Sequence, residues 1–219
     1  MKLWSDSFKD GGSIPGEFAF GVIDPVTHVA LSANRNPHFA WSDLPAGTKS
    51  LALICHDVDV PSRGDDVNQE GKAVPADLPR VDFFHWTLID LPAALSSIAA
   101  GAYSSAVTPR GKPGPQAGDQ PGRHGVNDYT GWFAGDADMA GDYYGYDGPC
   151  PPWNDSIMHR YVFTLFALDV ERLPVDGRFT GQQVRDALRG RILDEAKLIG
   201  IYTLNPLLAV SGNGRTGAL

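Results

Sequence analysis

The sequence predicts a mainly β protein, a β-sandwich with short helices added near its C-terminus. Three apolar runs rich in β-branched and aromatic residues have the character of strands, at 50–56, 82–89 and 161–168. The strongest helix signal comes after all three runs, whereas a parallel sheet would alternate strands with helices along the chain. The 25 glycines and 17 prolines indicate frequent turns and few long helices.

The run at 161–168 predicts a central strand. Tyr161, Phe163 and Leu165 alternate with Val162, Phe166 and other apolar residues, so both faces of this strand are apolar. Such a pattern is typical of a strand that is covered on both sides. Shorter runs at 18–22 and 39–41 are expected to form outer strands.

A capping box marks the predicted helix. Thr180 is a suitable N-cap residue, and Gln183 follows three residues later. Helical spacing of apolar residues continues beyond it to Ile199, which predicts a second helix. We expect Gly190 to separate the two helices and Gly200 to end the second.

Two long segments carry few signals for regular structure. They cover 62–81 and 104–147 and are rich in polar residues, glycine and proline. Loops of this length are uncommon in compact domains and are often functional. The sequence shows no linker and no internal repeat, so we expect one domain over 1–219 with long loop insertions at 62–81 and 104–147.

Charge and composition argue against several classes of function. The net charge is −8 with no cluster of basic residues, which disfavours nucleic acids and anionic membranes as partners. No apolar stretch is long enough for a transmembrane segment, and the first residues do not resemble a signal peptide, so a cytoplasmic protein is expected. Cys55 and Cys150 have no zinc-site spacing and are expected to be free thiols.

Polar residues gather where the predicted strands end. Asp57 and Asp59 are two residues apart, so both carboxylates share one side if the chain stays extended. His85 lies among aromatic residues in the second run. His159 and Tyr161 share a face at the start of the third run, whereas Arg160 points to the opposite side and is expected to anchor the structure.

Each of these features also has a structural explanation, as turn chemistry or as a buried histidine. If the strands are neighbours, however, their ends form a pocket of two carboxylates, two imidazoles and a phenol. Such a pocket suits either a divalent metal with bound water or a phosphate-like anion. The common catalytic motifs are absent, and nothing near Cys150 indicates an activated nucleophile with His159 as its base.

Two boxes in this order resemble the phosphatidylethanolamine-binding protein (PEBP) family, specifically its bacterial Raf-kinase-inhibitor-like branch. The first box is Asp57-Val58-Asp59-Val60-Pro61 followed by His85, and the second is Gly148-Pro149-Cys150-Pro151-Pro152 followed by His159-Arg160-Tyr161. Val58 and Val60 replace the family's proline and alanine. Residues 153–158 replace its glycine-rich spacer, and the two long segments exceed the usual length.

The resemblance implies a large central sheet packed on a smaller sheet, with a small anion-binding pocket at one end. It implies no catalytic residue, no metal and no cofactor. Expected partners are a small phosphorylated ligand or a phospholipid headgroup, and a protein kinase or protease; bacterial members are often homodimers. The ligand-binding residues that it implies are Asp57, Asp59, Pro61, His85, Gly148, Pro149, Pro151, His159 and Tyr161.

The leading hypothesis is therefore a non-enzymatic PEBP-like protein that binds a phosphate or other anionic headgroup and acts as a regulator or inhibitor. One alternative is a regulator that contacts a partner protein through the long loops. A second and weaker alternative is a metal-dependent hydrolase that uses the same polar residues.

Overall fold

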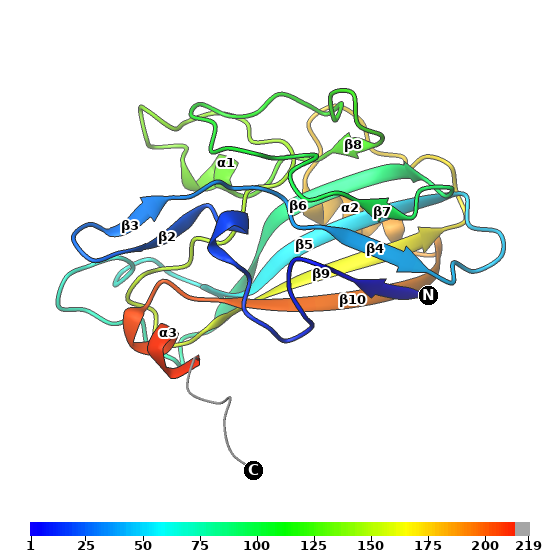
Figure 1. Cartoon of the computed structure of the whole chain (residues 1–219). Coiled ribbons are helices and arrows are strands. Elements are labelled where there is room, and N and C mark those ends of the chain that lie inside the picture. Colours follow the sequence, from blue (N-terminus) through cyan, green and yellow to red (C-terminus); the bar gives the residue numbers. More distant parts are fainter. Residues whose placement is uncertain (213–219) are drawn as a thin grey trace, which may run out of the picture.

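A computed structural model describes residues 1–212 and has a five-stranded antiparallel sheet at its centre (Figure 1). In spatial order the strands are β10 (Ile192–Tyr202), β9 (His159–Leu168), β5 (Ser50–Pro61), β6 (Arg80–Pro92) and β8 (Arg123–His124). The three predicted strands at 50–56, 82–89 and 161–168 are confirmed as the adjacent strands β5, β6 and β9, each longer than predicted.

Smaller β elements cover one face of the central sheet. A three-stranded sheet consists of β1 (Lys2–Trp4), β4 (Phe39–Ser42) and β7 (Ser97–Ile98). A separate hairpin pairs β2 (Gly21–Asp24) with β3 (His28–Leu31). The predicted mainly β architecture, with a large and a smaller sheet, is confirmed.

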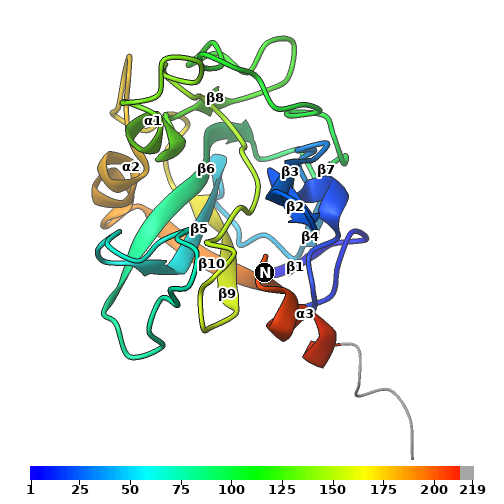
Figure 2. The ribbon, with the colours of Figure 1, turned by 90° about the vertical axis from the view of Figure 1, so that its left-hand side faces the viewer.

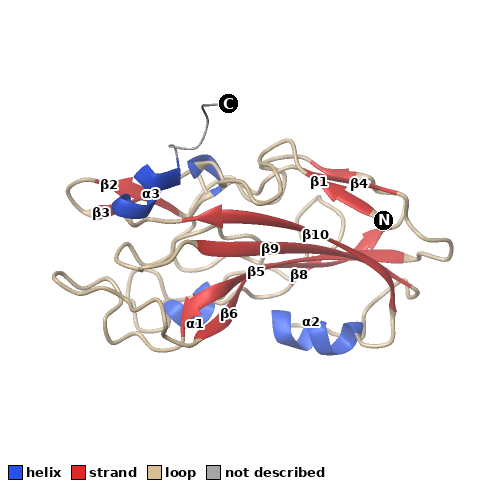
Figure 3. Ribbon diagram, turned by 90° about the horizontal axis from the view of Figure 1, so that it is seen from below, coloured by secondary structure: helices blue, strands red, loops and turns tan. Residues whose placement is uncertain are grey.

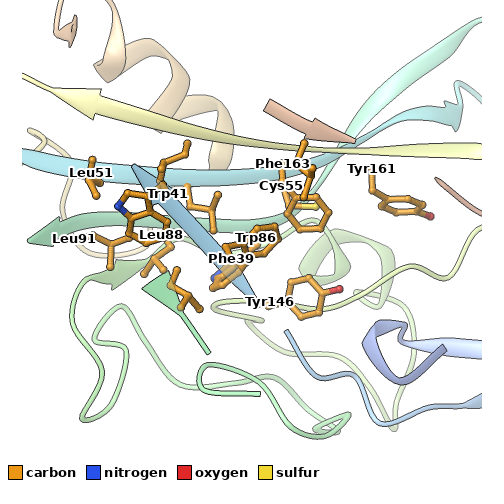
Figure 4. Close-up of a cluster of buried hydrophobic side chains, with 14 of the residues drawn as sticks. Phe39, Trp41, Leu51, Cys55, Trp86, Leu88, Leu91, Tyr146, Tyr161 and Phe163 are labelled. Carbon is orange, nitrogen blue, oxygen red and sulfur yellow. The ribbon is translucent and has the colours of Figure 1, made fainter. Parts of the chain in front are cut away.

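The central sheet is buried on both faces, as the pattern of β9 predicted. Towards the smaller sheet, Phe163 and Leu165 pack with Phe39, Trp41 and Trp86 in the main hydrophobic cluster (Figure 4). On the opposite face lies α2 (Gly181–Leu188), seen below the sheet in Figure 3. This helix contributes Val184 and Leu188 to a second cluster, together with Ala52, Ile54, Phe84 and Leu168.

The predicted capping box is present at the start of α2. The Gln183 backbone N–H donates to Thr180 Oγ1 at 3.3 Å, and the Thr180 N–H donates to Gln183 Oε1 at 2.9 Å. The remaining short helices are η1 (Gly16–Phe18), α1 (Tyr129–Trp132) and α3 (Pro206–Gly212). None of the helices within residues 1–212 is long and apolar enough to cross a membrane.

The second helix predicted after Gly190 is wrong, because those residues form strand β10. This strand pairs with β9 from Ile192 opposite Leu168 to Tyr202 opposite His159, which supplies partners to a whole edge of β9. Gly200 does not end a helix. A Cβ atom there would lie 2.4 Å from Ile14 Cγ1, so glycine allows the N-terminal segment to pack closely against β10.

The segment 104–147 holds more structure than its composition indicates. It contains β8 and α1, which lie beside β6 (Figure 2). The side chains of Tyr143, Tyr146 and Asp147 are fully buried. This segment therefore forms part of the core and supports the site described below.

Candidate functional site

A pocket of about 410 Å³ opens at the end of the central sheet where β5, β6 and β9 carry their polar residues. Asp57 comes from β5, His85 from β6, and His159 and Tyr161 from β9, and all four line the pocket. They converge because Asp57 lies opposite Phe83 on one side and opposite Tyr161 on the other. The convergence of these four side chains, expected if the strands were neighbours, is thus present in the fold.

His159 is clamped between two carboxylates. Its Nδ1–H donates to Asp57 Oδ2 at 2.7 Å and its Nε2–H donates to Asp155 Oδ2 at 3.0 Å. Burial opposes the charged form, but the hydrogen bonds to Asp155 and Asp57 prevail and raise the pKa of His159 to about 9. The ring is therefore an imidazolium at neutral pH, and neither nitrogen is free for a ligand.

His85 is held in one tautomer. Its Nδ1–H donates to the backbone carbonyl of Asp147 at 2.7 Å, so the neutral ring carries its lone pair on Nε2. Burial is the main cause that lowers the pKa of His85 below its usual 6.5. The ring is neutral at pH 7, and among the described residues Nε2 has no hydrogen-bond partner.

The Tyr161 hydroxyl is buried and no described residue accepts a well-formed hydrogen bond from it. The residue is fully buried at the end of the main hydrophobic cluster, and Figure 4 shows its hydroxyl turned away from that cluster. Burial first, and then the nearby Asp57 carboxylate, raise the pKa of Tyr161 well above its usual value, so the group remains a neutral donor. An unpaired buried hydroxyl is costly, and Tyr161 lines the pocket, so its hydroxyl is a hydrogen-bond donor on the pocket side of the hydrophobic cluster.

Asp59 does not line the pocket, contrary to the expectation that it shares a side with Asp57. The pairing of β5 with β6 shifts between Asp57 and Val60, where three steps along β5 match two along β6. This bulge adds one residue and reverses the alternation of sides. Val60 therefore reaches the pocket, whereas Asp59 receives hydrogen bonds from the Arg160 side chain at 2.7 and 2.8 Å.

The Asp59–Arg160 pair explains the predicted anchoring role of Arg160. Burial opposes the charge of Asp59, but the hydrogen bonds from Arg160 prevail and lower the pKa of this carboxyl group. The Arg160 backbone N–H also donates to Asp59 Oδ2 at 2.9 Å. Asp59 thus joins the ends of β5 and β9 outside the pocket.

Some residues of the proline-rich loop line the pocket, and others hold the loop in place. Pro61 and Pro151 line the pocket as expected, together with Cys150 and Pro152. Gly148 and Pro149 do not line it. The Gly148 N–H donates to Asn34 Oδ1 at 2.8 Å, and the Pro149 carbonyl accepts from Phe20 N–H at 2.9 Å, so both residues fix the loop.

Both cysteines are free thiols, as predicted. Cys55 lies in the core, whereas Cys150 is half-buried in the pocket wall, a more prominent place than the sequence indicated. Burial raises the pKa of Cys150 to about 12, and the imidazole of His159 is already paired. A thiolate nucleophile activated by His159 is therefore not supported.

Sequence reasoning missed Asp155 and the aromatic wall. The only sequence signal for Asp155 was its place in the unusual spacer, four residues before His159 on the chain. The wall includes Phe20, Phe83, Tyr129 and Phe133, which come from segments far apart in the sequence and meet only in the folded chain. Trp132 stands at the pocket with 57% of its surface exposed.

Comparison with known proteins decides the family. The family model of phosphatidylethanolamine-binding proteins matches residues 4–203, which is most of the chain. The chain belongs to the phosphatidylethanolamine-binding protein family. The resemblance to this family that the two sequence boxes indicated is confirmed.

Relatives in this family cover nearly the whole chain. The UPF0098 protein of Chlamydia muridarum is 31% identical over 202 residues, covering 92% of this chain and 98% of that protein. The UPF0098 protein YbhB of Escherichia coli is 29% identical over 203 residues, covering 93% of this chain and 100% of that protein.

Two solved PEBP structures have a similar fold. A PEBP homologue from Chlamydia trachomatis has 27% identity and a TM-score of 0.60, covering 92% of this chain and 95% of that one. YbcL of Escherichia coli, described as a member of the mammalian PEBP family, has a TM-score of 0.63 and covers 92% of this chain and 97% of its own. At 24% identity, the likeness to YbcL supports the fold alone.

Charge is balanced beneath the PEBP pocket of this chain. The His159 imidazolium pairs with the carboxylates of Asp57 and Asp155. Arg80 adds a second cation, and its Nη1 lies 2.6 Å from Asp155 Oδ2. Arg63 adds an exposed guanidinium at the pocket, 3.5 Å from Asp65. Among the described residues, no group of three or more His, Cys, Asp or Glu side chains is arranged to hold a metal ion.

Proposed function

We propose that this chain is a non-enzymatic PEBP whose pocket binds the phosphate group of a small phosphorylated molecule or of a phospholipid headgroup. The observation that carries the proposal is that the buried Tyr161 hydroxyl and His85 Nε2 lie in the same pocket, each without a well-formed hydrogen bond to a described residue. The centroids of the two rings are 5.1 Å apart, and both residues line the same pocket.

The two side chains complement a phosphate that carries one proton. Tyr161 offers a hydrogen-bond donor, and the neutral His85 offers an acceptor. A phosphate P–OH can donate to His85 Nε2 while a second phosphate oxygen accepts from Tyr161. Arg63 at the pocket contributes an additional positive charge.

Isothermal titration with phosphoethanolamine and with inorganic phosphate tests this proposal, using Tyr161→Phe as the variant. Hydrogen bonds to charged groups contribute roughly 1.5–3 kcal/mol, so we expect the affinity to fall about tenfold or more. The fold of this variant should be nearly as stable as the wild type, because the deleted hydroxyl makes no well-formed hydrogen bond to any described residue.

Tyr146→Phe is the matched control. Its hydroxyl is also buried but donates to the Phe18 carbonyl at 2.6 Å, away from the pocket. We expect this variant to lose about 1–3 kcal/mol of stability and to keep its phosphate affinity. Failure of the wild type to bind either ligand, or equal binding by Tyr161→Phe, would contradict the proposal.

A second candidate is a regulator that contacts a protein kinase or protease, and the observation that favours it is Trp132. This exposed side chain of α1 belongs to the 104–147 segment and stands at the pocket, and tryptophan is common at protein interfaces. Deleting this segment would remove the buried Asp147, so a point variant is the better test.

Inhibition of a purified serine protease and of a purified protein kinase by wild type and by Trp132→Ala distinguishes this role. If the protein acts through this surface, the variant should lose inhibition. Equal inhibition by both proteins would exclude Trp132 as the contact.

The metal-dependent hydrolase alternative receives no support from the donor set. Both nitrogens of His159 donate to carboxylates, and an imidazolium cannot coordinate a metal ion. The same hydrogen bonds occupy Oδ2 of Asp57 and of Asp155.

A further inference from the structure

The spacer at 153–158 and the long segment at 62–81 fit together as one unit. The Asn154 side chain donates to the carbonyls of Asp66 at 2.8 Å and of Lys72 at 3.1 Å, and its Oδ1 accepts from Asn68 N–H at 2.9 Å. The Val74 N–H donates to the Asn154 carbonyl at 3.0 Å, and the Ser156 N–H donates back to the Val74 carbonyl at 3.2 Å. The spacer is thus hydrogen-bonded to backbone groups of the 62–81 segment.

Asp155, the next residue, connects this loop to His159 and Asp57, the paired side chains that form the floor of the pocket. Its carboxylate accepts from Arg80 Nη1 at 2.6 Å and from Arg80 Nη2 at 3.0 Å, as well as from His159. Arg80 also donates to the Asp59 and Pro75 carbonyls, at 2.9 and 2.8 Å. The Asp155 carboxylate is almost completely buried, so its charge depends on these two cations.

The loop held in this way forms part of the pocket. Ser62, Arg63, Gly64, Val67 and Asn68 all line it. The wall that they form is therefore connected to His159 through Arg80 and Asp155 within the protein.

We propose that Asp155 is a positioning residue of the pocket, which holds His159 against Asp57 and joins the 62–79 loop to the floor through Arg80. The consequence for binding rests on the proposed function. As an imidazolium, His159 compensates the negative charge of Asp57 below the pocket, so that an anion is not repelled. Without Asp155, His159 keeps one carboxylate instead of two, and its ring loses the proton at lower pH.

Several charged or titratable groups face His159, and they come from every element packed around it. From β5, β6, β9, β10 and the spacer these are Asp57, Asp59, Arg80, His85, Asp155, Tyr161 and Tyr202, the last of which lies directly opposite His159 in the sheet. Asp155 and Asp57 bond the ring directly, and burial is the cause that works against its charge. Removing Asp155 should therefore change the pKa of His159 more than removing a residue that does not touch the ring.

Nitrogen-detected NMR titration of the His159 ring tests the first half of the proposal without any ligand. In the wild type both ring nitrogens should stay protonated from pH 6 to 8, since the pKa of His159 is about 9. In Asp155→Asn the pKa should fall by roughly 1 to 3 pH units, the effect of one close opposite charge. Titration of the wild-type ring below pH 7 would overturn the proposal even if the variant does not fold.

Limited trypsin digestion tests the second half, because the loop contains Arg63 and Lys72. Asp155→Asn and Arg80→Gln should both be cut faster at these sites, by several-fold, as the loop opens more often. The two variants should differ in the His159 pKa that NMR measures. Arg80→Gln removes a cation near His159 and should not lower its pKa.

Asp66→Asn is the matched control, since Asp66 lies in the same loop 3.4 Å from Lys72 and does not touch His159. It should change neither the His159 titration nor the cleavage rate by more than about twofold. If Asp155→Asn speeds cleavage but leaves the His159 pKa unchanged, Asp155 is only a structural anchor and the proposal is wrong.

The affinity for inorganic phosphate completes the test. The ratio of variant to wild-type affinity cancels the ionisation of free phosphate, which is the same for both proteins. For Asp155→Asn this ratio should fall at least about tenfold as the pH rises through the new His159 pKa. A ratio independent of pH would refute the charge-compensating role, whereas absence of phosphate binding by the wild type would refute the proposed function and leave the NMR and digestion results decisive.

Discussion

The neutral imidazole of His85 places a proton requirement on any phosphate ligand. Its Nδ1–H is committed to the Asp147 carbonyl, so Nε2 can only accept a hydrogen bond while the ring is neutral. Burial lowers its pKa below 6.5, so the ring does not carry a second proton at pH 7. A fully ionised phosphate has no proton to donate, and complex formation therefore requires one additional proton.

Phosphoethanolamine affinity should consequently depend on pH. The second pKa of a phosphate monoester is about 6, so above it the affinity should fall by about tenfold for each pH unit. Binding at pH 7.5 should take up nearly one proton. Titration calorimetry in two buffers with different ionisation enthalpies measures this number directly, and constant affinity from pH 6 to 8 would contradict the assigned tautomer.

At the scale of the elements, the bulge in β5 decides which aspartate serves the pocket. Without the extra residue, Asp57 and Asp59 would project to the same side. With it, Asp57 bonds His159 at the pocket, and Asp59 bonds Arg160 outside it. The sequence contains no marker for this bulge, because Val58 and Val60 suit a regular strand equally well.

Asp59→Asn and Asp57→Asn should therefore have different effects. Asp59→Asn weakens a partly exposed ion pair and should lower the free energy of unfolding by about 1 kcal/mol, with unchanged phosphate affinity. Asp57→Asn removes a buried partner of the His159 imidazolium and should change the affinity. Urea unfolding and phosphate titration of both variants provide the comparison, and equal effects on affinity would refute the assignment.

At the same scale, β10 shows why one secondary-structure prediction failed. Helical spacing and strand alternation overlap in this segment, since Ala196, Leu198 and Gly200 also share a face of a strand. Pairing with β9 decides between them, and the N-terminal segment then covers the free edge of β10. The Ile14 N–H donates to the Ile201 carbonyl at 2.9 Å, and the Ile201 N–H to the Gly12 carbonyl at 3.0 Å.

At the scale of the whole molecule, the sequence predicted what depends on pattern and missed what depends on long-range pairing. The apolar runs were sufficient to place three central strands, and four of the expected polar residues meet at their ends. The position of Asp59 depended on a bulge. The role of Asp155 depended on Arg80, which is 75 residues away along the chain. The aromatic wall depended on how the 104–147 segment folds back onto β6.

Asp57, Arg80, Asp155 and His159 form a cluster of ion pairs that connects distant parts of the chain. The interactions in this cluster should therefore contribute to the free energy of unfolding. Its members come from β5, β6, β9 and the spacer at 153–158. The pKa of His159 is about 9 in the folded protein and about 6.5 in an unfolded chain. A raised pKa gives stability that is fully present below about pH 6.5 and is lost as the pH rises through about 9.

Wild type should accordingly lose stability between pH 6.5 and pH 10 relative to His159→Gln, which cannot titrate at this position. The pKa difference corresponds to on the order of 3 kcal/mol, because one pKa unit equals about 1.4 kcal/mol. Urea unfolding of both proteins at pH 6.5, 8 and 10 measures it, and the difference cancels other groups that titrate in this range. A wild-type advantage that stays constant with pH would mean that His159 is neutral in the folded protein, and the charge balance assigned to the pocket floor would then be incorrect.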